Sequence, residues 1–401
     1  MRSKITTVVL AALSSFIAVA IITHPEEALK ASLRGLDIWW TAVFPALLPF
    51  FIVAELLIHF GVVRFIGVLL EPFMRPLFRV PGIGGFVWAM AMASGNPAGP
   101  KICVDLRNKH LLTRMEGERL VAFTSCANPL FIIGAVSVGF FENPALGILL
   151  ALAHYGANIF VGLVMRFYGK DELSAGQPLP FSLKVAFREM HEARIKQKQP
   201  FGKLLGDAVS GSVQTLLMVG GFIILFSVLN RLLAVMQVTD FFASVTGVLF
   251  TLLHLPLQLG SPFISGLFEM TIGSQLVSEL VDVPLLQQAL VVSFLLAFGG
   301  FSIQAQVASI LARSDLRFFP FFIARILQGI FAAIITLFLW QPVYVERLSR
   351  ESQPVWLMFS EQSYMIRENV FATIGPPVTI SFLLIYIWLY MRRNFNRSSI
   401  S

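Results

Sequence analysis

Gly95-Asn96-Pro97-Ala98-Gly99-Pro100-Lys101 is followed, 171 positions further along the chain, by a second glycine-led segment, Gly266-Leu267-Phe268-Glu269-Met270-Thr271. The same offset relates Val121-Ala122-Phe123 to Val292-Ser293-Phe294. The identities are few, but every hydrophobic segment between residues 37 and 167 has a counterpart 171 residues on, without a gap. Weak internal symmetry of hydropathy is the usual sign of structural repeats in membrane proteins. The sequence therefore predicts two copies of one membrane unit.

The composition places the chain in a bilayer. Of its 401 residues, 56% are hydrophobic and 13% are charged, and the mean hydropathy is +0.76. This leaves too little polar surface to cover a soluble globule of that length. The two cysteines, Cys103 and Cys126, lie in apolar surroundings and favour neither a disulfide framework nor a metal site.

A helix needs about 20 apolar residues to cross the hydrocarbon core. Segments that meet this requirement are found at residues 5–22, 37–58, 119–141, 144–167, 208–230, 289–311, 319–340 and 371–391. Eight crossings place both termini on the same side of the membrane. Because Ala18-Val19-Ala20 resembles a signal-peptidase site, cleavage of the first segment is an alternative to its retention as an anchor.

The distribution of basic residues predicts the orientation. Lysine and arginine collect at the N-terminus, at residues 59–118 and 168–203, and at the C-terminus, whereas residues 204–312 hold a single basic residue, Arg231. The positive-inside rule then puts both termini in the cytoplasm. In this topology segment 37–58 runs inward and its counterpart 208–230 runs outward, so the copies are inverted. The net charge of +7 follows from topology, and no nucleic-acid partner is expected.

Four segments do not fit as regular helices. Residues 81–104 and 255–280 are apolar but interrupted by glycine and proline, which predicts re-entrant hairpins, because irregular backbone at membrane depth must line a cavity or pack inside protein. The crossing at 119–141 contains Pro129, which cannot donate a backbone hydrogen bond, and the crossing at 289–311 contains Gly299-Gly300. Broken helices expose N-termini that attract anions. The two hairpins and the two breaks together predict a binding site at the membrane midplane.

The predicted fold is therefore an all-α polytopic membrane protein, with about eight transmembrane helices and two re-entrant helical hairpins in an inverted-topology repeat. Its expected parts are an N-terminal helix and outer loop at 1–36, a first repeat at 37–167, a basic cytoplasmic linker at 168–207, a second repeat at 208–340, and an outer loop and C-terminal helix at 341–401. The basic stretch 188–198 of the linker predicts a surface helix without a packing partner, and a docking site is the alternative.

The sequence motifs around the hairpins and breaks also resemble those of a known protein family. Residues 95–101, Phe123 to Gly134, Gly266 to Gly273 and Phe298 to Val307 resemble the YlbJ family of sporulation integral membrane proteins, which contain a nucleoside-recognition, or Gate, domain and are related to concentrative nucleoside transporters. The resemblance implies two Gate domains, one in each repeat, in a protein of an endospore-forming bacterium. It also implies passage of dipicolinic acid from the mother cell across the outer forespore membrane.

Carried over by motif, the substrate positions of the nucleoside transporters fall here on Asn96, Asn128, Glu269, Thr271, Ser302 and Gln304. The chain departs from the pattern at the first hairpin tip, where Asn96 stands in place of an aromatic residue. Ser125 and Gln306 complete the polar candidates on the broken spans, with hydrogen bonding between helices as the alternative.

Two charged residues are further candidates. Lys101 is a candidate ligand for a substrate carboxylate, and the alternative is an ammonium that snorkels to the cytoplasmic interface. Glu269 is the acid placed most firmly inside the membrane, and it would hydrogen-bond substrate or carry a proton, unless it pairs structurally with a neighbouring helix.

These expectations converge on a secondary transporter of a small organic anion, with dipicolinic acid favoured by the resemblance alone. A nucleoside or another small metabolite is the alternative substrate, and a non-transporting scaffold for spore envelope assembly is the alternative function. An enzyme is not expected, because the chain has no His-Glu-x-x-His, Gly-x-Ser-x-Gly or glycine-rich phosphate motif. No metal or cofactor is expected. The coupling ion, proton or sodium, and the oligomeric state remain open.

Overall fold

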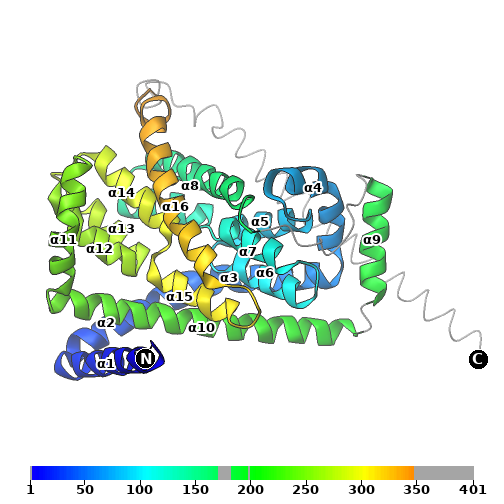
Figure 1. The fold of residues 1–401 in the computed structure, drawn as a ribbon, viewed down its shortest axis with the longest axis horizontal. Coiled ribbons are helices and arrows are strands. Elements are labelled where there is room, and N and C mark those ends of the chain that lie inside the picture. The colour runs from blue at the N-terminus through cyan, green and yellow to red at the C-terminus, as the bar shows by residue number, and fades with distance from the viewer. Residues whose placement is uncertain (1, 170–181, 197–198, 347–401) are drawn as a thin grey trace, which may run out of the picture. The chain divides into compact units, whose positions relative to one another are not determined.

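The computed structural model describes residues 2–169, 182–196 and 199–346. All regular elements within these ranges are helices, so the predicted all-α class is confirmed for the described part of the chain (Figure 1). The described residues up to Tyr344 belong to one unit by their contacts. The last predicted crossing, 371–391, lies outside the described residues, as does most of the predicted outer loop before it.

Fewer helices than the predicted eight are long and apolar enough to cross a membrane. Within the described ranges there are four: α8 (Pro144–Met165), α10 (Phe201–Val235), the combined length of α14 and α15 over Leu285–Leu311, and α16 with its following turn over Phe318–Val345. A fifth is formed if the apolar part of α3, Leu47–His59, and α4, Val62–Phe78, are counted as one span bent by 82°. The count of eight is thus not confirmed, because the remaining predicted crossings are short, interrupted or outside the described residues.

Both predicted breaks are present. Helix α7 (Arg114–Thr124) ends just before Ser125, whose backbone is extended, and a π-helical segment, η2 (Leu130–Phe140), begins after Pro129. Helices α14 (Leu285–Phe298) and α15 (Gly300–Leu311) are separated at Gly299. The φ angles of Gly299 and Gly300 are 81° and 70°, a conformation that glycine adopts without a steric penalty. The glycine pair therefore permits the second break.

Both predicted hairpins are also present. The first consists of α5 (Ile83–Ser94) and α6 (Ala98–Asn108), and the second consists of α12 (Gly260–Phe268) and α13 (Met270–Ser278). The two helices of each hairpin contact each other. In the second hairpin they meet at glycines, because a Cβ atom at Gly273 would lie 2.2 Å from the Cα atom of Gly266. The interrupted segments thus fold back on themselves, as the sequence predicts.

Replacing Gly273 by alanine is expected to force the second hairpin apart. The added methyl group would overlap the backbone of α12, which cannot move aside as a side chain can. We expect the variant to lose about 2 kcal/mol in free energy of unfolding, the usual scale of overpacking, in thermal melts of purified protein. Gly211→Ala on α10 is the matched control, because nothing lies within 4 Å of its added Cβ. Equal melting temperatures for the two variants would contradict this packing.

Helix α10 joins elements from both halves of the chain. It contacts α2 (Pro25–Ile38), α3 (Phe44–His59), α11 (Val238–Leu252), α12 and α15, and Figure 1 shows it in green, running below α15 and above α1. The Trp39 indole donates a hydrogen bond of 2.9 Å to the carbonyl of Leu216, and the Ser227 hydroxyl donates one of 2.8 Å to the carbonyl of Ala31. The segment after α1 (Arg2–Thr23) is thereby held against α10.

The prediction of a linker helix without a packing partner is wrong. Helix α9 (Leu183–Lys196) packs against α4, and the centroids of the Phe187 and Phe65 rings are 4.9 Å apart. A Cβ atom at Gly61 would lie 2.6 Å from the Met190 carbonyl, so the close approach depends on glycine. The basic composition of the linker hid the short apolar face that makes this contact.

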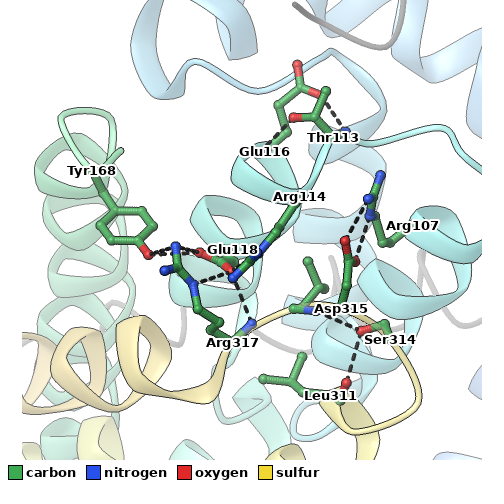
Figure 2. Close-up of polar contacts among 11 residues, drawn as sticks. Arg107, Thr113, Arg114, Glu116, Glu118, Tyr168, Leu311, Ser314, Asp315 and Arg317 are labelled. Carbon is green, nitrogen blue, oxygen red and sulfur yellow. Dashed lines mark hydrogen bonds and ion pairs between the residues drawn. The ribbon is translucent and has the colours of Figure 1, made fainter. Parts of the chain in front are cut away.

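A polar network connects the loop between α15 and α16 to the first half of the chain (Figure 2). Glu118 accepts hydrogen bonds from Arg317, Arg114 and Tyr168. Beside it, the Arg107 guanidinium makes two hydrogen bonds, of 2.7 and 2.8 Å, to the Asp315 carboxylate. These bonds hold the pKa of Asp315 below its usual value. The network, made of Arg107, Arg114, Glu118, Tyr168, Asp315 and Arg317, is called the junction network below.

Candidate functional site

The hairpin tips and the two breaks surround one cavity of about 430 Å³. Its wall includes Asn96 at the first hairpin tip, Glu269 at the second, Asn128 at the first break and Ser302 just after the second. Residues of α2, α3, η2 and α10, and of the segment between α2 and α3, complete the wall. Four interrupted segments from distant parts of the sequence therefore meet at a single place, which we call the central cavity.

Six of the nine predicted substrate-binding residues line the central cavity: Asn96, Asn128, Glu269, Thr271, Ser302 and Gln306. The other polar residues of the wall are Asp37, Thr41, Ser94 and Ser227. Apolar side chains make up most of the remaining wall, as is usual in sites for small molecules.

Glu269 occupies the turn between α12 and α13. Its carboxylate accepts a hydrogen bond of 2.9 Å from the backbone N–H of Ile272 and another of 3.1 Å from the hydroxyl of Thr271, so it caps the N-terminus of α13. An acid at this end of a helix is stabilised by the helix dipole. Structural pairing with a neighbouring helix end, the alternative considered from the sequence, is therefore observed at the N-terminus of α13, and within the described ranges no basic side chain pairs with Glu269.

Asn128 has a similar place at the first break. Its side-chain oxygen accepts a hydrogen bond of 2.7 Å from the backbone N–H of Phe131, and its side-chain nitrogen donates one of 3.1 Å to the carbonyl of Ser94. One residue thus caps η2 and ties it to the tip of the first hairpin. Ser125 lies outside the cavity wall, but its hydroxyl donates a hydrogen bond to the side-chain oxygen of Asn96 and so positions that residue.

Two further predicted residues also lie outside the wall. Gln304 is buried, with its side-chain nitrogen 3.5 Å from the carbonyl of Phe298. The Lys101 ammonium lies 3.3 Å from the Asp105 carboxylate and 3.7 Å from that of Glu55. Its charge is balanced within the protein, so the structure does not bring Lys101 to the cavity as a counter-charge for a bound carboxylate.

The backbone at the first break is held by side chains that the sequence reasoning did not select for a site. The N–H of Ala127 donates a hydrogen bond of 3.0 Å to Nε2 of His154, and the Tyr155 hydroxyl donates one of 2.9 Å to the Ala127 carbonyl. The buried Arg325 guanidinium donates to the carbonyls of Ser125 and Ala122. These bonds give hydrogen-bond partners to backbone N–H and carbonyl groups that the interruption of the helix leaves unpaired. A lone arginine within the apolar span at 319–340 was the available signal.

Asp37 is the acidic wall residue that the sequence reasoning missed. It lies near the end of α2, where the chain passes into the π-helical turn η1 (Trp39–Val43). Together Asp37 and Glu269 give the central cavity two carboxylates, and no lysine, arginine or histidine is found among the described residues of its wall. The cavity is therefore suited to a ligand that offers hydrogen-bond donors or positive charge.

These features define a polytopic helical membrane protein with a cavity lined by two hairpins and two interrupted helices. The family model described as Gate, nucleoside recognition, matches residues 40–144. Over 405 residues, covering 98% of both chains, the sequence is 54% identical to the sporulation integral membrane protein YlbJ of Bacillus subtilis (strain 168). The chain belongs to this YlbJ family. No solved structure matches it.

Proposed function

We propose that this protein is a secondary transporter that moves a small organic solute by alternating access, with the central cavity as its solute site. The observation that carries the proposal is the convergence of Asn96, Asn128, Glu269 and Ser302 on one cavity. Solute sites of many transporters lie between repeats and are built from discontinuous helices. A protein that only recruits partners would not need four interrupted segments around a shared cavity.

An inverted-topology repeat of eight crossings, with cytoplasmic termini, is part of this proposal. It is supported by the order of the elements, because shifting α5, α6, α7 and α8 by 171 residues overlaps them with α12, α13, α14 and α16. It is also supported by loop contacts. Tyr168 meets Arg317, and both lie in loops predicted to be cytoplasmic. Asn143 meets Tyr344, and both lie in loops predicted to be outside.

The favoured solute is dipicolinic acid, carried across the outer forespore membrane, and a nucleoside is the alternative. Dipicolinic acid is favoured by the family resemblance alone, and the Gate nucleoside-recognition match supports the nucleoside. Because Asp37 and Glu269 would repel a free dianion, dipicolinic acid would occupy the central cavity with a proton or a bound cation to offset its charge. Glu269 is the proposed carrier of the coupling proton.

The test is uptake of radiolabelled dipicolinate and uridine into proteoliposomes that contain the purified full-length protein. Asn96→Leu removes the polar group at the first hairpin tip, and we expect it to reduce uptake at least about tenfold, the loss that follows when a bound polar group is left unpaired. Asn108→Leu, at the exposed far end of α6, is the matched control and should transport normally.

The solute that the wild type accumulates decides between the two candidates. Absence of uptake for both, or equal uptake by both asparagine variants, would remove the transporter assignment. The scaffold alternative expects normal sporulation with Asn96→Leu and a defect when the linker 168–207 is deleted.

A further inference from the structure

A second hollow, of about 370 Å³, adjoins the central cavity. Ser227 on α10 and Ile272 on α13 belong to the walls of both, so the two spaces adjoin at these residues. The second hollow lies between α2, α10 and the hairpin of α12 and α13. We call it the vestibule.

The vestibule has the opposite charge to the central cavity. Its wall contains Lys30, Arg34 and Arg231 and a single acid, Glu27. The Arg231 guanidinium binds the Glu27 carboxylate at 2.5 Å, and the Lys30 ammonium lies 3.9 Å from the same carboxylate. Arg34 is exposed and pairs with no acid in the described part of the chain. The Lys30 ammonium also lies 3.7 Å from the carboxylate of Glu26, which is outside the wall, so Arg34 is the basic residue of the vestibule wall whose charge no described acid offsets.

One helix carries both kinds of wall. Residues 30, 34 and 37 are spaced four and three positions apart on α2, so they lie along one face of the helix. Lys30 and Arg34 belong to the vestibule and Asp37 belongs to the central cavity. A solute that passes along this face between the two spaces therefore moves between walls of opposite charge. Arg231 is the single basic residue of residues 204–312, so a basic cluster here is not expected from the surrounding composition.

We propose that the vestibule is a separate anion-binding site, where Lys30 and Arg34 hold the carboxylate group of a small organic anion beside the central cavity. This rests on the proposed function only in that the anion is the transported solute. Hollows lined by one sign of charge concentrate ions of the opposite sign. In the proposed topology the vestibule lies on the outer side of the central cavity, so the site would receive the anion as it leaves that cavity.

The test is equilibrium binding of radiolabelled pyridine-2,6-dicarboxylate to purified full-length protein in nanodiscs, with pyridine-2,6-dicarboxamide as the uncharged probe of the same shape. Exposed charge pairs are each worth roughly threefold in affinity, so Arg34→Gln with Lys30→Gln should weaken dicarboxylate binding about tenfold. Dicarboxamide binding should not change. Arg34→Lys should bind nearly as the wild type does, because it keeps the charge. Arg194→Gln on α9 is the charge-matched control, since it lies in neither wall.

Two outcomes would overturn the vestibule site: no dicarboxylate binding by the wild type, or wild-type affinity in the double variant. Folding does not obscure the result, because both side chains are exposed and the melting temperature of each variant is measured in parallel. Asn96→Leu separates this proposal from the transporter proposal, since it should retain dicarboxylate binding in the vestibule while losing uptake. Binding that depends on Arg34 without any uptake by the wild type would keep the anion site and remove the transporter.

Discussion

Replacement of Glu269 by glutamine is expected to abolish uphill solute accumulation in proteoliposomes. Glutamine has nearly the same shape and keeps an oxygen that can accept the N–H of Ile272, so the cap of α13 is retained. The variant loses the negative charge and the ability to take up and release a proton. If Glu269 carries the coupling proton, uptake driven by a pH gradient should fall at least about tenfold, which corresponds to about 1.4 kcal/mol.

The measurement compares uptake driven by a pH gradient with exchange of labelled for unlabelled solute at equal concentrations. Exchange needs the cavity but no coupling, so it should persist in Glu269→Gln. Glu279→Gln is the matched control, because Glu279 directly follows the same helix α13 but is exposed and outside the cavity wall. Accumulation by Glu269→Gln at the wild-type level would exclude this residue as the proton carrier.

The interrupted elements were the most predictable part of the fold. Pro129 and the pair Gly299-Gly300 mark the breaks because one lacks a backbone donor and the others adopt positive φ at little cost. The same local chemistry identified both hairpins. Their convergence on the central cavity is not a local property, and it was predicted only through the internal repeat. The number of crossings was less accessible, because apolar length alone does not distinguish a straight span from α3 and α4, which bend by 82°.

The charged residues are the least predictable part of the site, because the sequence does not show which groups their side chains contact. Lys101 is a candidate ligand from the sequence because a dicarboxylate solute would supply its counter-charge, but Asp105 lies one helical turn away and Glu55 approaches from α3. Asp37 was overlooked at the edge of a predicted crossing. For Arg325 the partners are backbone carbonyls of another helix, about 200 residues away in the sequence. Such partners carry no sequence pattern.

Replacement of Glu118 by alanine is expected to destabilise the protein by about 3 kcal/mol, the loss typical of removing one member of a buried charged network. The Glu118 side chain has no exposed surface and accepts hydrogen bonds from Arg317, Arg114 and Tyr168 (Figure 2). Without it, the loop between α15 and α16 loses its main attachment to α7. Thermal melting of purified protein measures the effect. Glu192→Ala is the control, because Glu192 and its ion-pair partner Arg188, both on α9, have exposed side chains.

The stabilisation that Glu118 contributes to the fold should depend on pH in a defined direction. Burial opposes ionisation of Glu118, but the hydrogen bonds from Arg317, Tyr168 and Arg114 outweigh it and hold the pKa of the carboxyl below its usual value of 4.5. A group whose pKa is lower in the folded state stabilises the fold above its unfolded pKa and loses that contribution as the pH falls through the folded value. The difference in stability between wild type and Glu118→Ala should therefore be constant between about pH 6 and 8 and shrink below about pH 4.5. A difference that grows on acidification would show that Glu118 is protonated in the junction network, and the ion-pair description of the network would then be wrong.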